Sequence, residues 1–271
     1  VDIFRKPLMA LFDKIIFKKV REGLGGQMKF FVGGGALLDI DLQRYYYAIG
    51  IPMYQGYGLS EATPIISANS PAKHIFGSSG KVVTPMEIKI LDADGVEQPY
   101  GSKGEICIKG ENVMAGYWKN PKSTADTIVD GWLHTGDIGV LDKNGLKITG
   151  RIKEIIVTSN GKNINPELPE QDFIKQSQYV EEIGIFLHKD VLHAAIRPNM
   201  SNIRLQSLEN MDVLIKDEVS KFNLQNTTYK RIKQYHIIST EFPKTRLGKL
   251  QRYKLPSLIE KTESKISNEK E

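Results

Sequence analysis

One short segment of the chain gathers three side chains that suit a nucleotide. Residues 54–64 read YQGYGLSEATP, in which Tyr57 lies between two glycines and is followed by Ser60 and Glu61. An aromatic ring can cover an adenine face, a hydroxyl can bind a phosphate oxygen, and a carboxylate can hold a hydrated Mg²⁺ ion. This combination of residue types indicates a site for a nucleotide with its magnesium ion.

A second segment, GWLHTGDIG at residues 131–139, offers a carboxylate and an imidazole. Its glycines predict a turn around Asp137, whose ionised carboxylate can accept two hydrogen bonds from the hydroxyls of a ribose diol. His134 can be interpreted as a general base. A single histidine in a turn is more often structural, however, and we assign it no role.

A third segment, VGGGALL at residues 32–38, is weaker evidence for a nucleotide. It lacks the Lys-Ser/Thr pair of a phosphate-binding loop and the glycine spacing of a dinucleotide fingerprint. By itself it predicts only a tight turn between a strand and a helix.

The basic segment FPKTRLGKLQRYKL at residues 242–255 has three interpretations: a phosphate-binding edge, a nucleic-acid patch or a solvated surface. The chain carries a net charge of +5, but its basic residues alternate with acidic ones along the whole length. This mixed distribution does not indicate extensive binding to nucleic acid.

Composition predicts an ordinary globular protein. The chain has 271 residues, 40% of them apolar and 25% charged, which is enough for a sizeable core and two domains. Its single cysteine, Cys107, cannot form an internal disulfide and is expected to pack in a strand, which favours a reducing, intracellular compartment. No apolar run reaches the roughly 18 residues of a membrane-spanning helix, and we identify no secretory signal. Because the first residue is Val1, we expect the natural protein to begin upstream.

The elements that must position these side chains begin with helix and strand in alternation. Residues 1–26 predict an amphipathic helix that packs on a sheet, with a membrane surface as the alternative. Its apolar side is formed by Leu8, Leu11, Phe12, Ile15, Ile16 and Val20. Residues 28–35 predict a short buried strand, and Asp39 is the predicted N-cap of a helix over residues 40–50.

From about residue 75 the pattern changes to short alternating strands. Asp-Gly at residues 94–95 and Asn-Gly at residues 144–145 predict hairpin turns, and thus a small antiparallel sheet or barrel. After Arg151, strands and helices predict a compact α+β unit, with a long polar helix over about 203–222. The tail after about residue 260 is rich in Lys, Glu and Ser and is expected to be disordered.

Five motifs occur in the order found in the adenylate-forming enzymes, the AMP-binding superfamily. They are YQGYGLSEATP, GEICIKGENVMAGYWKNP, GWLHTGDIG, ITGRIKEIIVTSNGKNINP and PKTRLGKLQR. The chain most resembles the long-chain fatty acid–CoA ligase (acyl-CoA synthetase) branch. The resemblance implies α/β and α+β folds. Residues 1–151 would be the C-terminal part of the large AMP-binding domain, with an α/β sheet and a small β-barrel, and residues 152–271 the small mobile α+β lid domain.

The resemblance also implies roles for single residues. Lys249 matches the lysine that catalyses adenylation, where an ammonium offsets the repulsion between a carboxylate and the α-phosphate of ATP. Glu61 would organise Mg²⁺, Lys153 would be the hinge between the domains, and Gly161 would lie in the loop of the thioester step. The residues expected to contact the nucleotide are Gly34, Gly35, Ala36, Gln55, Gly56, Tyr57, Gly58, Ser60, Asp137 and Arg151.

The implied reaction has two steps. A fatty acid carboxylate attacks the α-phosphorus of Mg·ATP to give acyl-adenylate and pyrophosphate, and the thiol of coenzyme A then displaces AMP. The alternatives are another adenylate-forming enzyme, such as an aryl–CoA ligase or a peptide-synthetase adenylation domain, and a non-catalytic nucleotide-binding or interaction protein on the same scaffold.

The family's phosphate-binding loop does not occur in this sequence, and by resemblance most of the acyl pocket would lie upstream of Val1. We therefore expect the chain alone to bind ATP weakly and not to turn over, and its first part to expose surfaces meant for the rest of the enzyme. The expected partners are small molecules and not nucleic acid. The expected location is the cytoplasm, with peripheral contact at the inner membrane left open, as are acyl chain length and oligomeric state.

Overall fold

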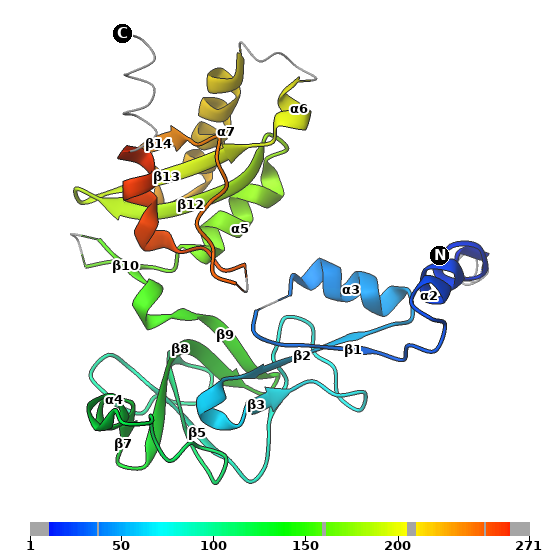
Figure 1. Ribbon diagram of the computed structural model, residues 1–271, viewed down its shortest axis with the longest axis vertical. Helices are drawn as coiled ribbons and strands as arrows, with labels where there is room; N and C mark the ends of the chain where they lie inside the picture. Colours follow the sequence, from blue (N-terminus) through cyan, green and yellow to red (C-terminus); the bar gives the residue numbers. More distant parts are fainter. Residues whose placement is uncertain (1–10, 37, 159–160, 205–209, 247, 261–271) are drawn as a thin grey trace. The chain divides into compact units, whose positions relative to one another are not determined.

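The computed structural model describes residues 11–36, 38–158, 161–204, 210–246 and 248–260. The chain divides into two compact units, Val1–Ile152 and Lys153–Glu271, called here the first and the second unit (Figure 1). Each of the three clusters of buried apolar side chains lies within one unit. The division lies next to the domain boundary predicted from the sequence. The predicted disordered tail falls outside the described residues.

The first unit contains two sheets. The four-stranded sheet has the order β1-β2-β3-β4, in which β1 and β2 are parallel and the other pairs antiparallel. Its strands are β1 (Phe31–Gly33), β2 (Met53–Gly58), β3 (Ile65–Ala68) and β4 (Lys81–Val82). The helices in this part are η1 (Asp13–Phe17), α2 (Lys18–Gly23), α3 (Ile40–Ala48) and the short η2 (Ser60–Ala62).

The second sheet of the first unit is the antiparallel one that the hairpin signals predict. It has the order β5-β6-β8-β7, with β9 also paired to β8, and it curls without an observed pairing between β5 and β9 in the part of the chain described. Its strands are β5 (Glu87–Leu91), β6 (Lys103–Lys109), β7 (Ile128–Val129), β8 (Trp132–Asp142) and β9 (Gly145–Arg151), and α4 (Pro121–Thr127) precedes β7. Isoleucine and leucine side chains fill its core, among them Ile106, Ile108 and Leu133.

The helix predicted over residues 1–26 is observed in its described part as η1 and α2, but its apolar side there is not buried on a sheet. Leu11, Phe12, Ile15 and Ile16 are 53%, 41%, 51% and 46% exposed, and Leu8 lies outside the described residues. Such a row of exposed apolar side chains agrees with the expectation that this part of the chain leaves apolar surface uncovered.

The strand predicted to be buried at residues 28–35 is partly exposed instead. β1 lies at the edge of its sheet, and Val32 is 72% exposed, so the face of the sheet from which this side chain projects is uncovered there. The predicted cap of the next helix is confirmed. Asp39 accepts hydrogen bonds from the backbone N–H groups of Asp41 and Leu42 and so begins α3.

The second unit is built around a three-stranded sheet with the order β12-β13-β14, whose strands are β12 (Val180–His188), β13 (Val191–Pro198) and β14 (Gln234–Ile237). Side chains alternate along β12, so that Ile183 and Ile185 join one core cluster while Phe186 joins the other. Helices α5 and α7 contribute to the first cluster, and the segment after β14 contributes Phe242, Leu255 and Ile259 to the second (Figure 1). The sheet is therefore covered on both faces.

The elements of the second unit begin with η3 (Ile152–Glu154), which spans the division, and the hairpin of β10 (Ile156–Val157) and β11 (Asn163–Ile164). The later elements are α5 (Glu167–Gln176), β12 (Val180–His188), β13 (Val191–Pro198), α6 (Met200–Arg204), α7 (Met211–Gln225), η5 (Thr228–Lys230), β14 (Gln234–Ile237) and η6 (Arg252–Lys254). The polar helix predicted over 203–222 is observed as α6 and α7, and residues 205–209 between them are not described. Within the described ranges, no helix has the length and apolar character needed to cross a bilayer.

Gly145, at the turn of the β8–β9 hairpin, lies against the backbone of Gly80, which directly precedes β4 of the other sheet. Its φ is +94°, and a Cβ atom there would lie 2.2 Å from the carbonyl oxygen of Gly80. We expect Gly145→Ala to destabilise the first unit by about 3 kcal/mol, because backbone strain and a clash with another backbone segment add together. The midpoint of urea unfolding, followed by tryptophan fluorescence, measures this loss, since Trp118 and Trp132 both lie in the first unit.

The matched control is Gly95→Ala in the neighbouring hairpin turn. Gly95 also has a positive φ, +77°, but an added Cβ would meet no atom within 4 Å. This variant should lose only about 1 kcal/mol from backbone strain. Equal losses in the two variants would show that the contact with Gly80 does not constrain the hairpin.

Candidate functional site

Three of the predicted nucleotide-contacting residues meet in the first unit. Tyr57 near the end of β2, Asp137 in β8 and Arg151 at the end of β9 come from three separate strands. The hydroxyl of Tyr57 donates a hydrogen bond of 2.6 Å to Oδ2 of Asp137, and Nε of Arg151 lies 2.5 Å from Oδ1. Asp137 is 6% exposed, whereas the Arg151 side chain is 49% exposed. The carboxylate is therefore fixed from two sides.

The Tyr57 hydroxyl is held in its protonated form. Burial and then the negative charge of Asp137 raise the pKa of Tyr57 well above its usual range. Because the phenol stays protonated, it donates to the carboxylate and orients it. An ionised carboxylate offers about four acceptor positions, so two remain for the hydroxyls of a diol.

The predicted turn around Asp137 is wrong, since this residue lies within the continuous strand β8. Glu105 pairs with Ile138 and Cys107 with His134, so Ile106 alone faces the three residues from Thr135 to Asp137. Gly136 in this bulge has a φ of +68°. A bulged strand needs a glycine where a turn would also need one, which explains the wrong prediction.

Glu61, the predicted magnesium ligand, lies in η2 beside a loop that the sequence did not connect with it. Its Oε1 accepts a hydrogen bond of 2.9 Å from the hydroxyl of Tyr117, and its backbone oxygen accepts one from the N–H of Met114. Ser60 beside it is exposed. Gly58 precedes this turn, where a Cβ would lie 1.8 Å from the carbonyl oxygen of Pro64, so only glycine fits.

Gln55 and the glycine segment at residues 34–36 are neighbours in the structure. The amide nitrogen of Gln55 donates to the carbonyl oxygen of Ala36 at 2.8 Å, and its amide oxygen accepts from the N–H of Leu38 at 3.2 Å. Gln55 is 2% exposed, whereas Gly34, Gly35 and Ala36 are exposed. Gln55 thus holds the glycine segment against β2 next to Gly56, and its predicted contact with nucleotide stays a prediction.

Lys249, the predicted catalytic lysine, belongs to the second unit and carries two ionic contacts there. Its Nζ lies 2.6 Å from Oε1 of Glu154 and 3.5 Å from Oε1 of Glu167. The side chain of Lys249 is 39% exposed. Glu154 follows Lys153, the predicted hinge residue, in η3. Sequence reasoning missed both carboxylates because they lie far from Lys249 along the chain.

The predicted loop of the thioester step is the turn of the β10–β11 hairpin. Gly161 has a φ of +70° and donates its N–H to the carbonyl oxygen of Thr158 at 2.8 Å. The side chain and N–H of Thr158 also bond Lys162. The positive φ favours glycine at this position, whatever its role in chemistry.

A buried ion pair anchors the segment that carries Lys249. Arg252 donates to both carboxylate oxygens of Glu170, at 2.6 and 3.3 Å, and Oε1 of Glu170 also accepts from the N–H of Ile185. The side chains of Arg252 and Glu170 are only 13% and 10% exposed. The pair thus fixes η6 to α5 and β12. Arg252 lies only three residues after Lys249, so the segment of Lys249 is fixed as well.

We expect Arg252→Ala to destabilise the second unit by about 3 kcal/mol, because it leaves a buried carboxylate without its cation. Burial raises the pKa of Glu170 to about 7, although Arg252 lowers it. Without Arg252 the folded pKa rises further above the unfolded value, so stability keeps falling as pH increases. The loss relative to the unmodified chain should be larger near about pH 8 than near about pH 6.

Urea unfolding followed by far-ultraviolet circular dichroism measures this loss, and tryptophan fluorescence monitors the first unit as an internal reference. Lys254→Ala, in the same turn but exposed, is the control and should change little. A loss that is the same at both pH values would mean that Glu170 does not carry the effect.

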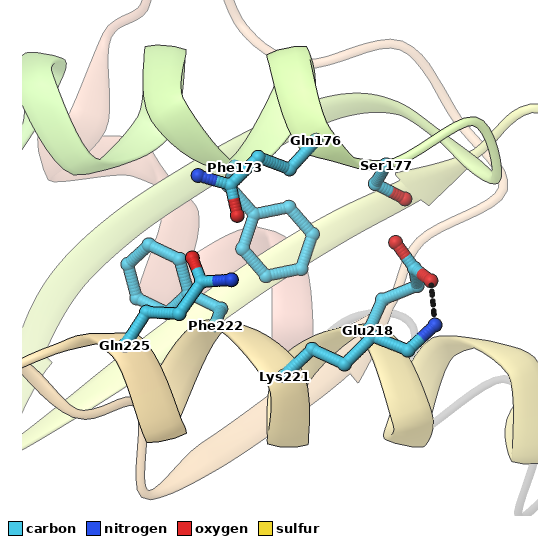
Figure 2. A pocket seen from close by; sticks show the side chains of 7 residues that line it. All are labelled: Phe173, Gln176, Ser177, Glu218, Lys221, Phe222 and Gln225. Atoms are coloured by element: carbon cyan, nitrogen blue, oxygen red, sulfur yellow. Dashed lines mark hydrogen bonds and ion pairs between the residues drawn. The ribbon is translucent and has the colours of Figure 1, made fainter.

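The second unit contains a pocket (Figure 2). It has a volume of about 320 Å³ and lies between α5 and α7, with the rings of Phe173 and Phe222 beside it. Glu218 and Lys221 form an ion pair of 2.9 Å at one side. None of the residues predicted to contact nucleotide lines this pocket.

Comparison with protein families agrees with the motifs. The model of the AMP-binding enzyme family matches residues 6–118, and the model of the C-terminal domain of AMP-binding enzymes matches residues 153–266. The second match begins at Lys153, where the second compact unit begins. The chain belongs to the AMP-binding enzyme family.

Within this AMP-binding family, relatives carry the name of long-chain-fatty-acid–CoA ligase. FadD15 of Mycobacterium bovis is 39% identical over 162 residues, which are 59% of this chain and 25% of FadD15. The long-chain-fatty-acid–CoA ligase of Salmonella typhimurium is 33% identical over 228 residues, which are 82% of this chain and 39% of that enzyme. The chain thus spans between a quarter and two fifths of the length of these two relatives.

Solved structures of AMP-binding enzymes confirm the predicted fold. The O-succinylbenzoate coenzyme A synthetase MenE of Bacillus subtilis, in complex with AMP, is 28% identical, with a TM-score of 0.66. The alignment covers 83% of this chain and 45% of the synthetase. The family and fold predicted from the five motifs are therefore correct.

Proposed function

We propose that the protein containing this chain activates a long-chain fatty acid with ATP and transfers the acyl group to coenzyme A. The arrangement of Tyr57, Asp137 and Arg151 carries this proposal. It presents an aromatic ring, an oriented carboxylate and a half-exposed guanidinium together, which suit adenine, a ribose diol and a phosphate.

In the first half-reaction, the fatty acid carboxylate attacks the α-phosphorus of ATP, the bond to the β-phosphate oxygen breaks, and pyrophosphate leaves. Two anions must approach each other in this step. We propose that the ammonium of Lys249 offsets their repulsion and the charge that develops on the phosphoryl oxygens. For this task Lys249 must exchange its contacts with Glu154 and Glu167 for contacts with the reacting groups.

Glu61 is the proposed residue for the magnesium ion. A carboxylate oxygen is a donor that Mg²⁺ prefers, and the bond from Tyr117 to Oε1 leaves other acceptor positions on this group. When bound, the ion would neutralise charge on the ATP phosphates. The same synthetase of Bacillus subtilis has been solved with ATP and a magnesium ion, which supports a magnesium–nucleotide substrate here.

In the second half-reaction, the sulfur of coenzyme A attacks the acyl carbon, its proton leaves, and AMP departs. We propose that Lys153 is the hinge between the two units and that the hairpin with Gly161 serves this step. Both assignments come from the resemblance to the family.

The acid substrate is the finer part of the proposal. The names of FadD15 and of the Salmonella enzyme favour a fatty acid, whereas the name of the synthetase of known structure favours an aromatic acid. Exchange of radioactive pyrophosphate into ATP by the complete protein, with fatty, aromatic and amino acids as substrates, separates these classes.

We expect exchange that depends on long-chain fatty acids. Exchange with aromatic acids alone would favour an aryl–CoA ligase, and exchange with amino acids alone would favour a peptide-synthetase adenylation domain. Binding of AMP without exchange for any acid would favour a non-catalytic protein on the same scaffold. Each of these three results would overturn the fatty acid assignment.

A further inference from the structure

Three potential metal ligands converge on one face of the second sheet of the first unit. Glu105 and Cys107 are two residues apart on β6, so their side chains point to the same face. Cys107 pairs with His134 across the β6–β8 ladder. The donor atoms of all three residues lie within 4.8 Å of one another.

The distances within this cluster fit a transition metal. Sγ of Cys107 lies 3.5 Å from Nδ1 of His134, and Nδ1 lies 2.9 Å from Oε2 of Glu105. Zinc–sulfur and zinc–nitrogen bonds of about 2.3 and 2.05 Å at a tetrahedral angle put these two atoms about 3.5 Å apart. The observed distance of 3.5 Å between Sγ of Cys107 and Nδ1 of His134 already matches this value. Oε2 of Glu105 needs to move outward by about half an ångström for the same geometry.

A backbone hydrogen bond fixes the carboxylate of Glu105 through the oxygen that does not face His134. Oε1 accepts a hydrogen bond of 3.1 Å from the N–H of Gly136, so the carboxylate is fixed through one oxygen while the other points at His134. Metal ligands are commonly oriented in this way by a backbone partner.

Access and charge also allow a cation. Cys107 is buried, but the side chains of His134 and Glu105 are 28% and 17% exposed, so an ion can enter beside them. Burial, followed by the charge of Glu105, raises the pKa of the Cys107 thiol to about 12. Binding of a metal to this sulfur must therefore release the thiol proton.

We propose that Glu105, Cys107 and His134 bind one Zn²⁺ ion, with the fourth position open to water or another ligand. Sulfur, nitrogen and carboxylate oxygen together are a donor set typical of zinc. Three protein ligands are one fewer than in closed structural sites, so one coordination position stays open to water. The proposal does not depend on the activity of the protein.

Co²⁺ serves as a probe in place of Zn²⁺ because its complexes absorb visible light. The chain has a single cysteine, Cys107. Titration of the 271-residue chain with Co²⁺ alone should give a thiolate-to-metal charge-transfer band and the visible bands of a tetrahedral ion, at one equivalent. Any such charge-transfer band must come from Cys107. Zn²⁺ should remove both sets of bands by competition.

Substitutions test each of the three proposed ligands. Cys107→Ser should abolish the charge-transfer band, and Glu105→Gln and His134→Asn should each weaken Zn²⁺ binding by at least about tenfold. The matched control is His193→Asn. Nδ1 of His193 lies 3.0 Å from Nε2 of His236 in the second unit, a histidine pair that could hold a metal without sulfur. This control should keep the band and the affinity.

Two results would overturn the proposal. One is a chain that binds Co²⁺ without a charge-transfer band or does not bind it at all. The other is a loss of binding in His193→Asn with no change in His134→Asn. If Cys107→Ser does not fold, the rate at which iodoacetamide modifies the unmodified chain decides instead, since bound Zn²⁺ should slow it by at least about tenfold.

Discussion

Replacing Lys249 with alanine should lower the rate of acyl-adenylate formation by the complete protein by about 100- to 1,000-fold, the range expected when one electrostatic contact to the transition state is lost. The measurement is pyrophosphate exchange with the preferred acid. The second half-reaction should change much less. Acyl-adenylate supplied with coenzyme A should give thioester at nearly the unmodified rate, because no negative phosphoryl group is being attacked in that step.

The ionic contacts of Lys249 make a folding control necessary. Alanine leaves Glu154 and Glu167 without their shared cation, but the three side chains are all partly exposed, so the cost in stability should be small. Lys254→Ala, an exposed lysine in the nearby η6, should leave both half-reactions unchanged. An equal loss in both half-reactions for Lys249→Ala would mean that this lysine supports folding or general binding, and the catalytic assignment would be withdrawn.

Asp137→Ala should weaken AMP binding to the complete protein by about 10- to 100-fold. Hydrogen bonds to a charged group contribute about 1.5 to 3 kcal/mol, and this change removes the proposed acceptor of the ribose hydroxyls. It also releases the Tyr57 hydroxyl and the Arg151 guanidinium that the carboxylate holds at 2.6 and 2.5 Å. Isothermal titration calorimetry with AMP measures the change.

Two companion variants separate ribose binding from local disorder. Tyr57→Phe keeps the ring but loses the hydroxyl, and should weaken AMP binding less than Asp137→Ala. Asp142→Asn changes a carboxylate at the far end of the same strand, where it accepts the N–H of Asn144, and should leave AMP affinity unchanged. Unchanged AMP affinity in Asp137→Ala would remove Asp137 from the proposed site.

Local sequence determined much of this protein. The Asp-Gly and Asn-Gly turns, the Asp39 cap and the alternating strands of the first unit are properties of neighbouring residues, and the structure confirms them. The five ordered motifs identified the family, because each motif is a continuous segment. They also named the residue types of the candidate site, since the motif positions are fixed along the chain.

Only the tertiary structure decided which of these side chains touch. Tyr57 and Asp137 are 80 residues apart and meet because the end of β2 lies beside the middle of β8. The bulge that contains Asp137 depends on the pairing of β8 with β6. Cys107 and His134 were interpreted separately as packing and as a structural histidine, and become a candidate metal site through strand register. Hydrogen bonds and ion pairs across strands depend on register and burial, and neither is a property of a short segment.

The dependence of burial and side-chain contacts on tertiary packing also explains the wrong and the missed predictions. The predicted burial of β1 failed because a strand's burial depends on what packs against the faces of its sheet, and the Val32 side chain projects from a face that is uncovered there. The carboxylates that hold Lys249 were missed because residues 154 and 249 are brought together only by the fold of the second unit. Spacing along the chain fixes helices, strands and turns, whereas distances between side chains follow from how those elements pack.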